Sequence, residues 1–264
     1  MKAIISTTYS DTYLYFLPIT TWCWNRLNVD VICFIPFPEW EDTEKMLLIS
    51  NTMGNNGMGF SGHYFSASEH KEATYAQCLR NYGAAVDGLD ENELLCTSDI
   101  DMICFRQPPY NDMLTVWGSD LVPQGQMPMC YITGTVKQWK EAFSIGGRTY
   151  QQCIDDLLGD DECKDYRGNR WSRDQELAHD YISKLNHSLV PRAREGTQWA
   201  KNRLDRDDSY ILDRLNLSNE DYHMNRPGYE DKNFQIILTI LQYHYPQEDF
   251  GWLVSYNEEY KKLL

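Results

Sequence analysis

The sequence predicts an α/β protein, in which a mixed, mostly parallel central sheet is flanked by helices and followed by a helical C-terminal extension. Two patterns carry this prediction. Short apolar runs of strand length alternate along the chain with amphipathic stretches of helical spacing. The chain also opens with a strand, a helix and a second strand, an order that joins parallel strands by a right-handed crossover. With 264 residues, of which 42% are hydrophobic, the chain is long enough to bury a sizeable core.

The N-terminal elements set the direction of the predicted sheet. Residues 3–6 form a short apolar run that predicts the first strand, and residues 13–26 have the pattern of a helix. The second strand covers residues 29–35 and is closed by Pro36 and Pro38. Ligands of such sheets bind at the carboxyl ends of the strands. The loop after the first strand is therefore a candidate binding loop.

A glycine-rich stretch separates this opening from the middle of the chain. Residues 51–62 contain four glycines and two adjacent asparagines, which predict a mobile loop and not a phosphate-binding fingerprint. A helix is predicted over residues 68–85, with Ser68 as its N-cap and Glu72 in its first turn. This helix leads directly to the apolar run of residues 94–105.

The second half of the chain continues the alternation. Its predicted elements are strands at 113–117 and 128–133, helices at 136–143 and 150–158, a polar connector at 159–168, a helix that opens at 171–177 with Ser172 as its N-cap, and a last helix at 231–243. Arginines and aspartates are interleaved beyond Pro191, and such mixed charge is typical of a solvated surface helix or loop.

The apolar run of residues 94–105 contains two carboxylates, Asp99 and Asp101. We expect a buried strand here, and a buried ionised carboxylate requires a cationic partner. Side chains at positions i and i+2 of a strand point to the same face, so both carboxylates can reach one ion or one polar ligand where the strand ends. Their hard oxygen atoms suit Mg²⁺ or Mn²⁺. The alternative is a turn or a helix N-cap that contains two aspartates.

Charge and cysteine content restrict the partners and the compartment. The formal net charge of −15 argues against nucleic acid, because lysine and arginine supply most of the affinity for phosphates. The eight cysteines show no CxxC spacing, which favours reduced, buried thiols. The N-terminal residues lack a signal-peptide pattern, and no window approaches the roughly 18 apolar residues of a membrane span. We therefore expect a cytoplasmic protein with no membrane span.

Five short stretches follow one another in chain order: Thr7-Thr8-Tyr9 after the first strand, Leu79-Arg80 on a helix, and residues 98–102 (SDIDM), 171–175 (WSRDQ) and 221–227 (DYHMNRP). In this order, over about residues 3–227, they resemble the glycosyltransferases with the GT-A fold, with the DxD tripeptide as the most specific element. The chain is also similar, in size and in lacking a membrane anchor, to the small soluble glycosyltransferases of large algal viruses.

The resemblance implies a fold and an activity. The fold is a GT-A (Rossmann-like) domain over residues 1–230, with a helical extension over residues 231–264 packed on the same domain. The activity is transfer of a sugar from a nucleoside-diphosphate donor, with a UDP-sugar favoured, to a glycan, a glycoprotein or a small molecule. The cofactor is Mn²⁺ or Mg²⁺, which bridges the DxD carboxylates and the diphosphate.

The resemblance also implies roles for the charged residues. Asp101 is the direct metal ligand, and Asp99 holds the ribose or a metal-bound water. His223 is a third ligand or a contact of the diphosphate. Arg226 follows it closely enough in the sequence to serve the same phosphates. Arg80 is expected to pair with the diphosphate, against the alternative of an ordinary surface arginine.

The loop after the first strand is expected to hold the nucleoside. In the family this loop uses backbone groups, hydroxyls and an aromatic ring, and its residues here are Thr7, Thr8, Tyr9 and Asp11. A turn with ordinary capping side chains explains the same residues. The glycine-rich residues 51–62 are a candidate lid over the donor.

The acceptor side depends on a second carboxylate. Asp174 is expected to be the general base of an inverting transfer, and in a retaining transfer Asp174 or Gln175 stabilises the anomeric carbon. The alternative is that Asp174 serves the N-terminus of its helix. Gly134 and Trp171 are expected near the sugars, with Trp171 as a stacking surface.

Two other functional classes use similar residues. A metal-dependent phosphohydrolase or nucleotidyltransferase also places paired carboxylates at a strand, and it is distinguished by two metal ions with a third carboxylate between them. A nucleotide-sugar-binding module without catalysis is the other alternative.

Overall fold

The computed structural model describes residues 1–264 except 38–42, 69–70, 111, 159–171 and 192–201. The described residues form a seven-stranded central sheet with the strand order β3-β2-β1-β4-β7-β6-β8. Its strands are β1 (Lys2–Ser6), β2 (Asp30–Pro36), β3 (Phe60–Phe65), β4 (Leu94–Thr97), β6 (Leu114–Trp117), β7 (Ile132–Thr135) and β8 (His187–Val190). Only β7 runs antiparallel to its neighbours within this sheet, so the expected mixed, mostly parallel sheet is confirmed.

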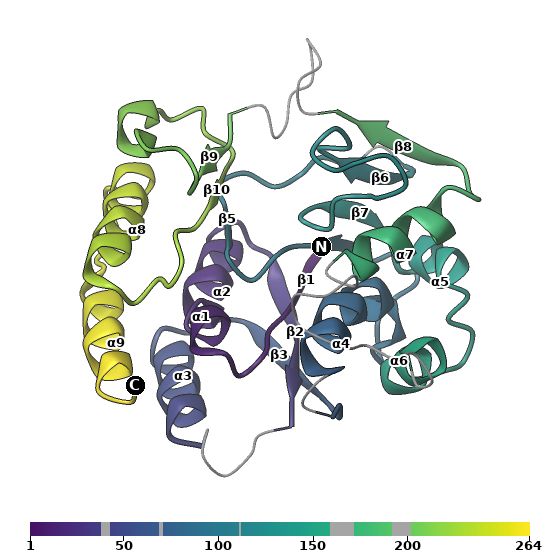
Figure 1. The fold of residues 1–264 in the computed structure, drawn as a ribbon, viewed down its shortest axis with the longest axis horizontal. Coiled ribbons are helices and arrows are strands. Elements are labelled where there is room, and N and C mark those ends of the chain that lie inside the picture. The colour runs from purple at the N-terminus through teal and green to yellow at the C-terminus, as the bar shows by residue number, and fades with distance from the viewer. Residues whose placement is uncertain (38–42, 69–70, 111, 159–171, 192–201) are drawn as a thin grey trace.

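The helices lie on both faces of this sheet (Figure 1). They are α1 (Asp11–Leu14), α2 (Leu17–Arg26), α3 (Thr43–Asn55), α4 (Glu72–Leu79), α5 (Val136–Ala142), α6 (Tyr150–Leu158), α7 (Arg173–Ile182), α8 (Asp231–His244) and α9 (Gly251–Lys261), with short 3-10 helices η3 (Arg80–Ala85) and η4 (Ile211–Arg214). Alternation along β1 separates two cores: Ala3 and Ile5 pack with α2, α3, α8 and α9, whereas Ile4 packs with α4 to α7. Both faces of β1 are therefore buried, as in other parallel sheets.

A second, three-stranded sheet lies beside the first and joins distant parts of the chain. Its strands are β5 (Met102–Cys104), β9 (Leu204–Asp205) and β10 (Asp221–His223), in the order β5-β10-β9. In this register His223 lies opposite Met102 on one side and opposite Asp205 on the other. The pairing brings the histidine next to the acidic pair, although about 120 residues separate them in the sequence.

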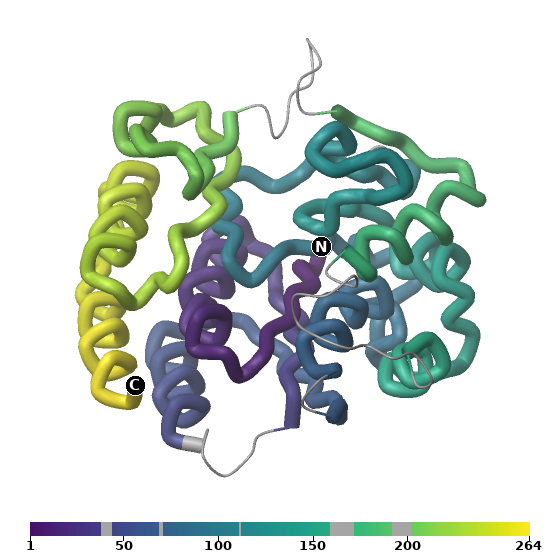
Figure 2. The backbone as a smooth tube through the Cα atoms, in the orientation of Figure 1, coloured from purple at the N-terminus to yellow at the C-terminus, as the bar shows by residue number. Residues whose placement is uncertain are grey.

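The C-terminal helices pack against the N-terminal ones (Figure 2). Tyr15 stacks on Tyr256 of α9 at 5.4 Å, and its hydroxyl donates to the Asn257 side chain at 2.9 Å. Trp22 of α2 lies edge-on to Phe250 at 5.2 Å. A domain boundary at residue 230 remains a prediction, and the packing that surrounds it is continuous with the core under β1.

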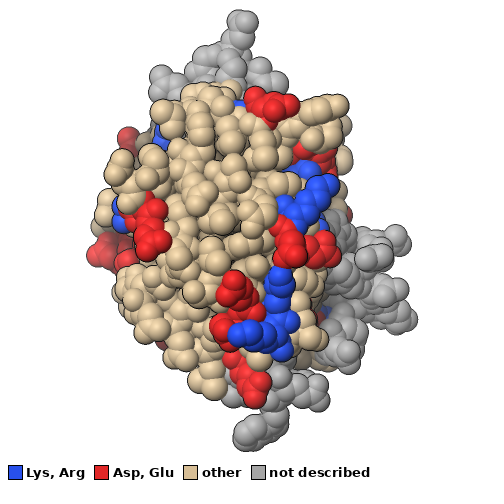
Figure 3. Space-filling model, turned by 90° about the vertical axis from the view of Figure 1, so that its left-hand side faces the viewer, with Lys and Arg blue, Asp and Glu red and all other residues tan. Residues whose placement is uncertain are grey.

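The face that carries α8 and α9 has few charges for so acidic a chain, and its basic side chains lie beside acidic ones (Figure 3). No described helix is both long and apolar enough to cross a membrane. The described cysteines are unpaired and buried, as expected.

Most predicted elements are confirmed to within a few residues, and three predictions are wrong. Residues 94–105 are not one strand, because β4 ends at Thr97 and β5 belongs to the second sheet. Residues 51–62 are not a loop: α3 runs through Gly54 to Asn55 and β3 begins at Phe60, so the region is also no lid. Burial of Ile49 and Met53 overrides the low helical propensity of the glycine. Helix α9 lies within the expected helical extension, although no separate helix was predicted after residue 243.

Two glycines allow a test of the packing between η3 and β1. A Cβ at Gly83 would lie 2.2 Å from Cδ1 and 2.9 Å from Cγ1 of the fully buried Ile4. We expect Gly83→Ala to lower the free energy of unfolding by about 1–3 kcal/mol through overpacking. At Gly54 in α3 a Cβ meets nothing within 4 Å, so Gly54→Ala is expected to raise the free energy of unfolding by about 0.5–1 kcal/mol. Urea denaturation measures both, and equal effects of the same sign would contradict the packing.

Candidate active site

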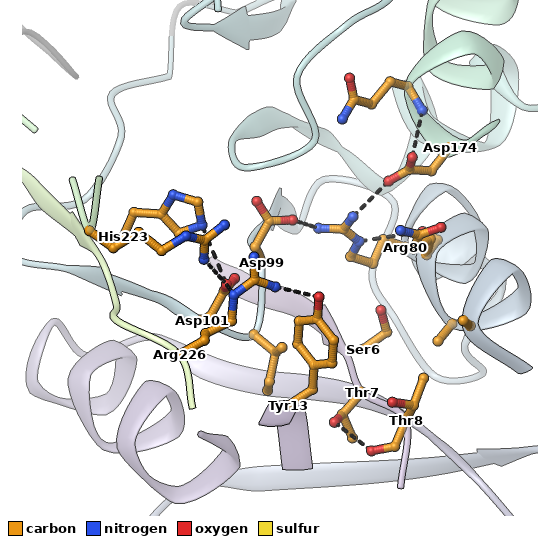
Figure 4. Close-up of a pocket in the computed structure, with 16 residues that line it drawn as sticks. Ser6, Thr7, Thr8, Tyr13, Arg80, Asp99, Asp101, Asp174, His223 and Arg226 are labelled. Carbon is orange, nitrogen blue, oxygen red and sulfur yellow. Dashed lines mark hydrogen bonds and ion pairs between the residues drawn. The ribbon is translucent and has the colours of Figure 1, made fainter. Parts of the chain in front are cut away.

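One pocket lies where β1 and β4 end (Figure 4). The residues expected from the sequence that line it are Thr7, Thr8, Arg80, Asp99, Asp101, Asp174, Gln175, His223 and Arg226. Thr7 follows β1, and its backbone N–H donates to the carbonyl of Phe34 at the end of β2. The pocket therefore lies at the carboxyl ends of parallel strands, where an α/β sheet binds its ligands.

The acidic pair lies in the turn between the two sheets. The chain leaves β4 after Thr97, and the N–H of Met102 donates to the carbonyl of Asp99 at 3.2 Å. The expectation that one strand directs both carboxylates to the same face is therefore wrong. Asp99 is 34% exposed and Asp101 only 6% exposed, and each has its own set of cationic partners. The turn alternative describes their backbone better.

Arg80 joins two carboxylates on one side of the pocket. It begins η3, and α4 carries it to the end of β4. Its Nη1 pairs with Asp99, and its Nη2 lies 2.7 Å from Oδ2 of Asp174. Nη1 also donates to the carbonyl of Ser98 at 3.2 Å. The side chain is 7% exposed, so the alternative of an ordinary surface arginine is wrong.

Asp174 lies in the first turn of α7 with both carboxylate oxygens engaged. Oδ2 faces Arg80, and Oδ1 accepts from the backbone N–H of Gln175 at 2.9 Å. Burial raises the pKa of Asp174, and the charge of Arg80 opposes that rise. The ion pair with Arg80 keeps this buried carboxylate supplied with a counter-charge.

Asp101 is surrounded by cations on the other side of the pocket. Its Oδ2 accepts from Nη1 of Arg206 at 2.7 Å and lies 3.3 Å from both Nε2 of His223 and Nε of Arg226. Burial by itself raises the pKa of Asp101, but these three groups together hold it well below its usual range. The requirement for a cationic partner is met here by the chain's own side chains.

His223 is held between two carboxylates. Its Nε2 faces Asp101, and its Nδ1 lies 3.8 Å from Oδ2 of Asp205. Burial alone lowers the pKa of an imidazole, but the bonds to these two carboxylates raise the pKa of His223 to about 9. Arg226 donates to the hydroxyl of Tyr13, and its guanidinium lies 5.0 Å from the centre of that ring.

The residues around Asp101 fit a divalent cation in kind. Two ligands of an octahedral ion with bonds of about 2.1 Å lie about 3 Å apart, and Oδ2 of Asp101 is 3.3 Å from Nε2 of His223. No three His, Cys, Asp or Glu side chains in the described residues already stand together as a metal site. Oxygen and imidazole ligands suit Mn²⁺ and Mg²⁺, so Asp101 and His223 are the residues that would hold one, and Asp99 lines the same pocket.

Three expected residues lie away from the pocket, and a fourth lies outside the described residues. The backbone N–H of Tyr9 donates to Glu72 at 3.2 Å. Asp11 pairs with Lys45 at 2.7 Å and accepts from the hydroxyl of Tyr260 at 3.0 Å, in contacts that join α1, α3 and α9. Gly134 lies in β7 opposite Leu95. Trp171 lies outside the described residues. Neither Tyr9, Asp11 nor Gly134 lines the pocket.

Two arginines in the mixed-charge run were not predicted to have buried partners in or near the site. Arg206 lines the pocket, and the buried Arg203 lies 2.6 Å from the fully buried Asp221 of β10. The prediction of a solvated segment is therefore wrong for these two residues. The signal available was Leu204, an apolar residue between charged ones, which is typical of a short strand with one buried face.

Comparison with solved structures identifies the fold. The galactosyltransferase LgtC, solved in complex with donor and acceptor sugar analogues, matches over 100% of both chains with a TM-score of 0.50 and 9% sequence identity. The chain shares the fold of LgtC. The glycosyltransferase GlyE of Streptococcus pneumoniae TIGR4 matches 99% of this chain and 63% of its own at 14% identity, with a TM-score of 0.47. No protein-family model matches the sequence, and no curated protein matches it.

Two histidines make stability depend on pH in opposite directions. Burial lowers the pKa of His244 to about 4, so protonation of this histidine favours the unfolded chain at low pH. The free energy of unfolding therefore rises as the pH rises from about 4 to 6.5. The raised pKa of His223 gives a contribution that is fully present below pH 6.5 and is lost as the pH rises towards 9. Between pH 6.5 and about 8 we expect the metal-free protein to lose on the order of 1–2 kcal/mol of unfolding free energy.

Chemical denaturation at a series of pH values measures this loss. His223→Gln removes the group that titrates, so the variant is expected to show a flatter profile over the same interval. His179→Gln replaces a half-buried histidine of α7 and is the matched control. A profile for His223→Gln as steep as that of wild type would contradict the assignment.

Proposed function

We propose that the protein is a metal-dependent glycosyltransferase, which transfers a sugar from a nucleoside-diphosphate donor to a hydroxyl of a glycan, a glycoprotein or a small molecule. One observation carries the proposal. In an acidic chain, three arginines and a histidine converge with three aspartates on one pocket at the carboxyl ends of the strands. The fold shared with LgtC supports a sugar-transfer reaction in this pocket. UDP-sugars are the donors that the resemblance of the sequence to the GT-A glycosyltransferases favours.

The cations of the pocket fit a diphosphate leaving group. Cleavage of the bond between the sugar and the diphosphate leaves negative charge on the phosphate oxygens, and preorganised donors lower the barrier by stabilising that charge. Arg80, Arg206 and Arg226 carry their charge into the pocket from η3, from the segment after β9 and from the segment after β10. Guanidinium groups match phosphate oxygens in geometry as well as in charge.

Asp99, Asp101 and His223 are the residues proposed to hold the divalent cation. When bound, Mn²⁺ or Mg²⁺ supplies Lewis-acid stabilisation of the leaving diphosphate. Binding requires a neutral imidazole, so His223 must release the proton that it carries at neutral pH. Asp101 must in turn exchange at least one of its guanidinium partners.

Asp174 and Gln175 are proposed to face the sugar. A general base must reach the acceptor hydroxyl, and the side chain of Asp174 is 3% exposed and ion-paired with Arg80. This favours a role in which Asp174 positions Arg80 and stabilises charge near the anomeric carbon, as in a retaining transfer. If the transfer inverts, Asp174 must direct a remaining lone pair of one carboxylate oxygen at the acceptor hydroxyl to act as the base.

The test measures binding and turnover separately. Purified protein is incubated with a panel of UDP- and GDP-sugars in Mn²⁺ or in EDTA, and nucleoside diphosphate release is followed with and without acceptors. We expect slow release from one donor that requires the metal. Absence of any nucleotide binding in Mn²⁺ contradicts the proposal, and binding without release indicates the binding module. Release of nucleoside monophosphate or inorganic phosphate indicates the phosphohydrolase or nucleotidyltransferase.

A further inference from the structure

Arg206 has a different set of contacts from the other cations of the pocket. It lies directly after β9, which the parallel pairing with β10 places beside His223. Its Nη1 donates to Oδ2 of Asp101 at 2.7 Å, the shortest of the three cationic contacts of that oxygen. Its side chain is 19% exposed, so it borders the open part of the pocket.

The three cations beside Asp101 are not held equally. Arg226 is also bonded to the hydroxyl of Tyr13 and packs over that ring, so it has a partner to retain if Asp101 is withdrawn. His223 is also held by Asp205. Within the described residues, the side chain of Arg206 has Asp101 as its one recorded partner. Arg206 is therefore the group that a new cation at Asp101 displaces with least loss of other contacts.

Displacement of Arg206 has a cost that depends on what else is in the pocket. In the empty pocket its release exchanges a charge-assisted hydrogen bond for solvent. With a diphosphate present, the same guanidinium can bind phosphate oxygens instead. Arg206 lies within hydrogen-bond distance of a proposed metal ligand, so a small rotation of its side chain brings it to a diphosphate bound to that metal. The exchange is then between two anionic partners and costs little.

We propose that Arg206 is a further residue of the donor site with two positions, on Asp101 when the pocket is empty and on the donor diphosphate when a divalent cation occupies Asp101. The proposal rests on the proposed function. It makes binding of the metal and of the diphosphate cooperative, because the metal releases Arg206 from Asp101 for the diphosphate, and the diphosphate draws Arg206 away from the ligand that the metal needs. Such a coupling is reciprocal, so it is measurable from either ligand.

The experiment measures Mn²⁺ binding by the loss of the free-ion electron paramagnetic resonance signal, with and without UDP. For Arg206→Gln we expect Mn²⁺ alone to bind about tenfold more tightly than to wild type, because its competitor is gone. The factor by which UDP strengthens Mn²⁺ binding is expected to fall about tenfold. Arg206→Lys keeps the charge and is expected to lie between the two. Arg214→Gln removes an exposed arginine of η4 that pairs with Asp208, and is expected to match wild type.

Each alternative outcome has a distinct pattern. If Arg206→Gln strengthens Mn²⁺ binding equally with and without UDP, Arg206 does not move to the diphosphate and the proposal is overturned. If Mn²⁺ alone binds with unchanged affinity, Arg206 does not compete at Asp101 and the proposal is again overturned. If wild type binds neither Mn²⁺ nor UDP in any combination, the proposed function itself fails. Thermal melting of each variant confirms that it is folded.

Discussion

Replacing Asp101 by asparagine is expected to reduce kcat/KM for sugar transfer by on the order of 10³-fold. Asp101 is the buried carboxylate on which His223, Arg206 and Arg226 converge, and it is the proposed direct ligand of the cation. Asparagine keeps the shape of the side chain but removes the charge that attracts a divalent ion. Initial rates at saturating Mn²⁺ over a series of donor concentrations measure the effect, and calorimetry of Mn²⁺ binding in UDP shows whether metal affinity falls with it.

Two further variants separate the roles within the acidic pair. Asp99→Asn is expected to lower kcat/KM by about 10–100-fold. The loss is smaller because Asp99 is proposed to support the ribose or a metal-bound water and not to bind the ion alone. Asp208→Asn removes a carboxylate of the same charged segment that pairs with Arg214 and does not line the pocket, so it is expected to leave activity unchanged. A loss for Asp99→Asn that exceeds the loss for Asp101→Asn would reverse the assigned roles.

The acidic pair shows what local pattern can and cannot establish. The apolar run of residues 94–105 correctly predicted that Asp101 is buried and needs a cation. The same run wrongly predicted one continuous strand, because an apolar run cannot show that β4 and β5 belong to different sheets. Burial depends on composition over a few residues, whereas the direction of a strand depends on pairing with β10, more than 100 residues away.

Partners distant in the sequence explain the other errors as well. The β-α-β opening and α6 were predictable because their apolar spacing is local. The mixed-charge run beyond Pro191 was not, since Arg203 and Arg206 take their roles from Asp221 and Asp101. The sequence shows that arginines and aspartates are interleaved in this run, but not which of them meet. The prediction that this run is solvated follows from the usual behaviour of exposed ion pairs. It fails where the ion pairs are buried.

Arg80→Met is expected to lower the free energy of unfolding at pH 7 by about 3–5 kcal/mol, because it leaves a buried carboxylate without its counter-charge. Arg80 and Asp174 are 7% and 3% exposed, and their atoms lie 2.7 Å apart. Arg148→Met is the matched control: Arg148 pairs with Asp156 at 2.8 Å, but the two are 39% and 62% exposed, so the expected loss is about 1 kcal/mol or less. Urea denaturation measures both.

The carboxylate of Asp174 can be removed in the Arg80→Met background to test the cause. If the unpaired charge is responsible, adding Asp174→Leu to Arg80→Met restores part of the lost stability, although Asp174→Leu alone destabilises. Lower pH should act in the same direction. Burial already raises the pKa of Asp174, and without Arg80 it rises further, so protonation relieves the variant as the pH falls and its deficit relative to wild type shrinks. A deficit that is constant with pH and additive in the double variant would mean that lost packing of the Arg80 side chain, and not the buried charge, sets the cost.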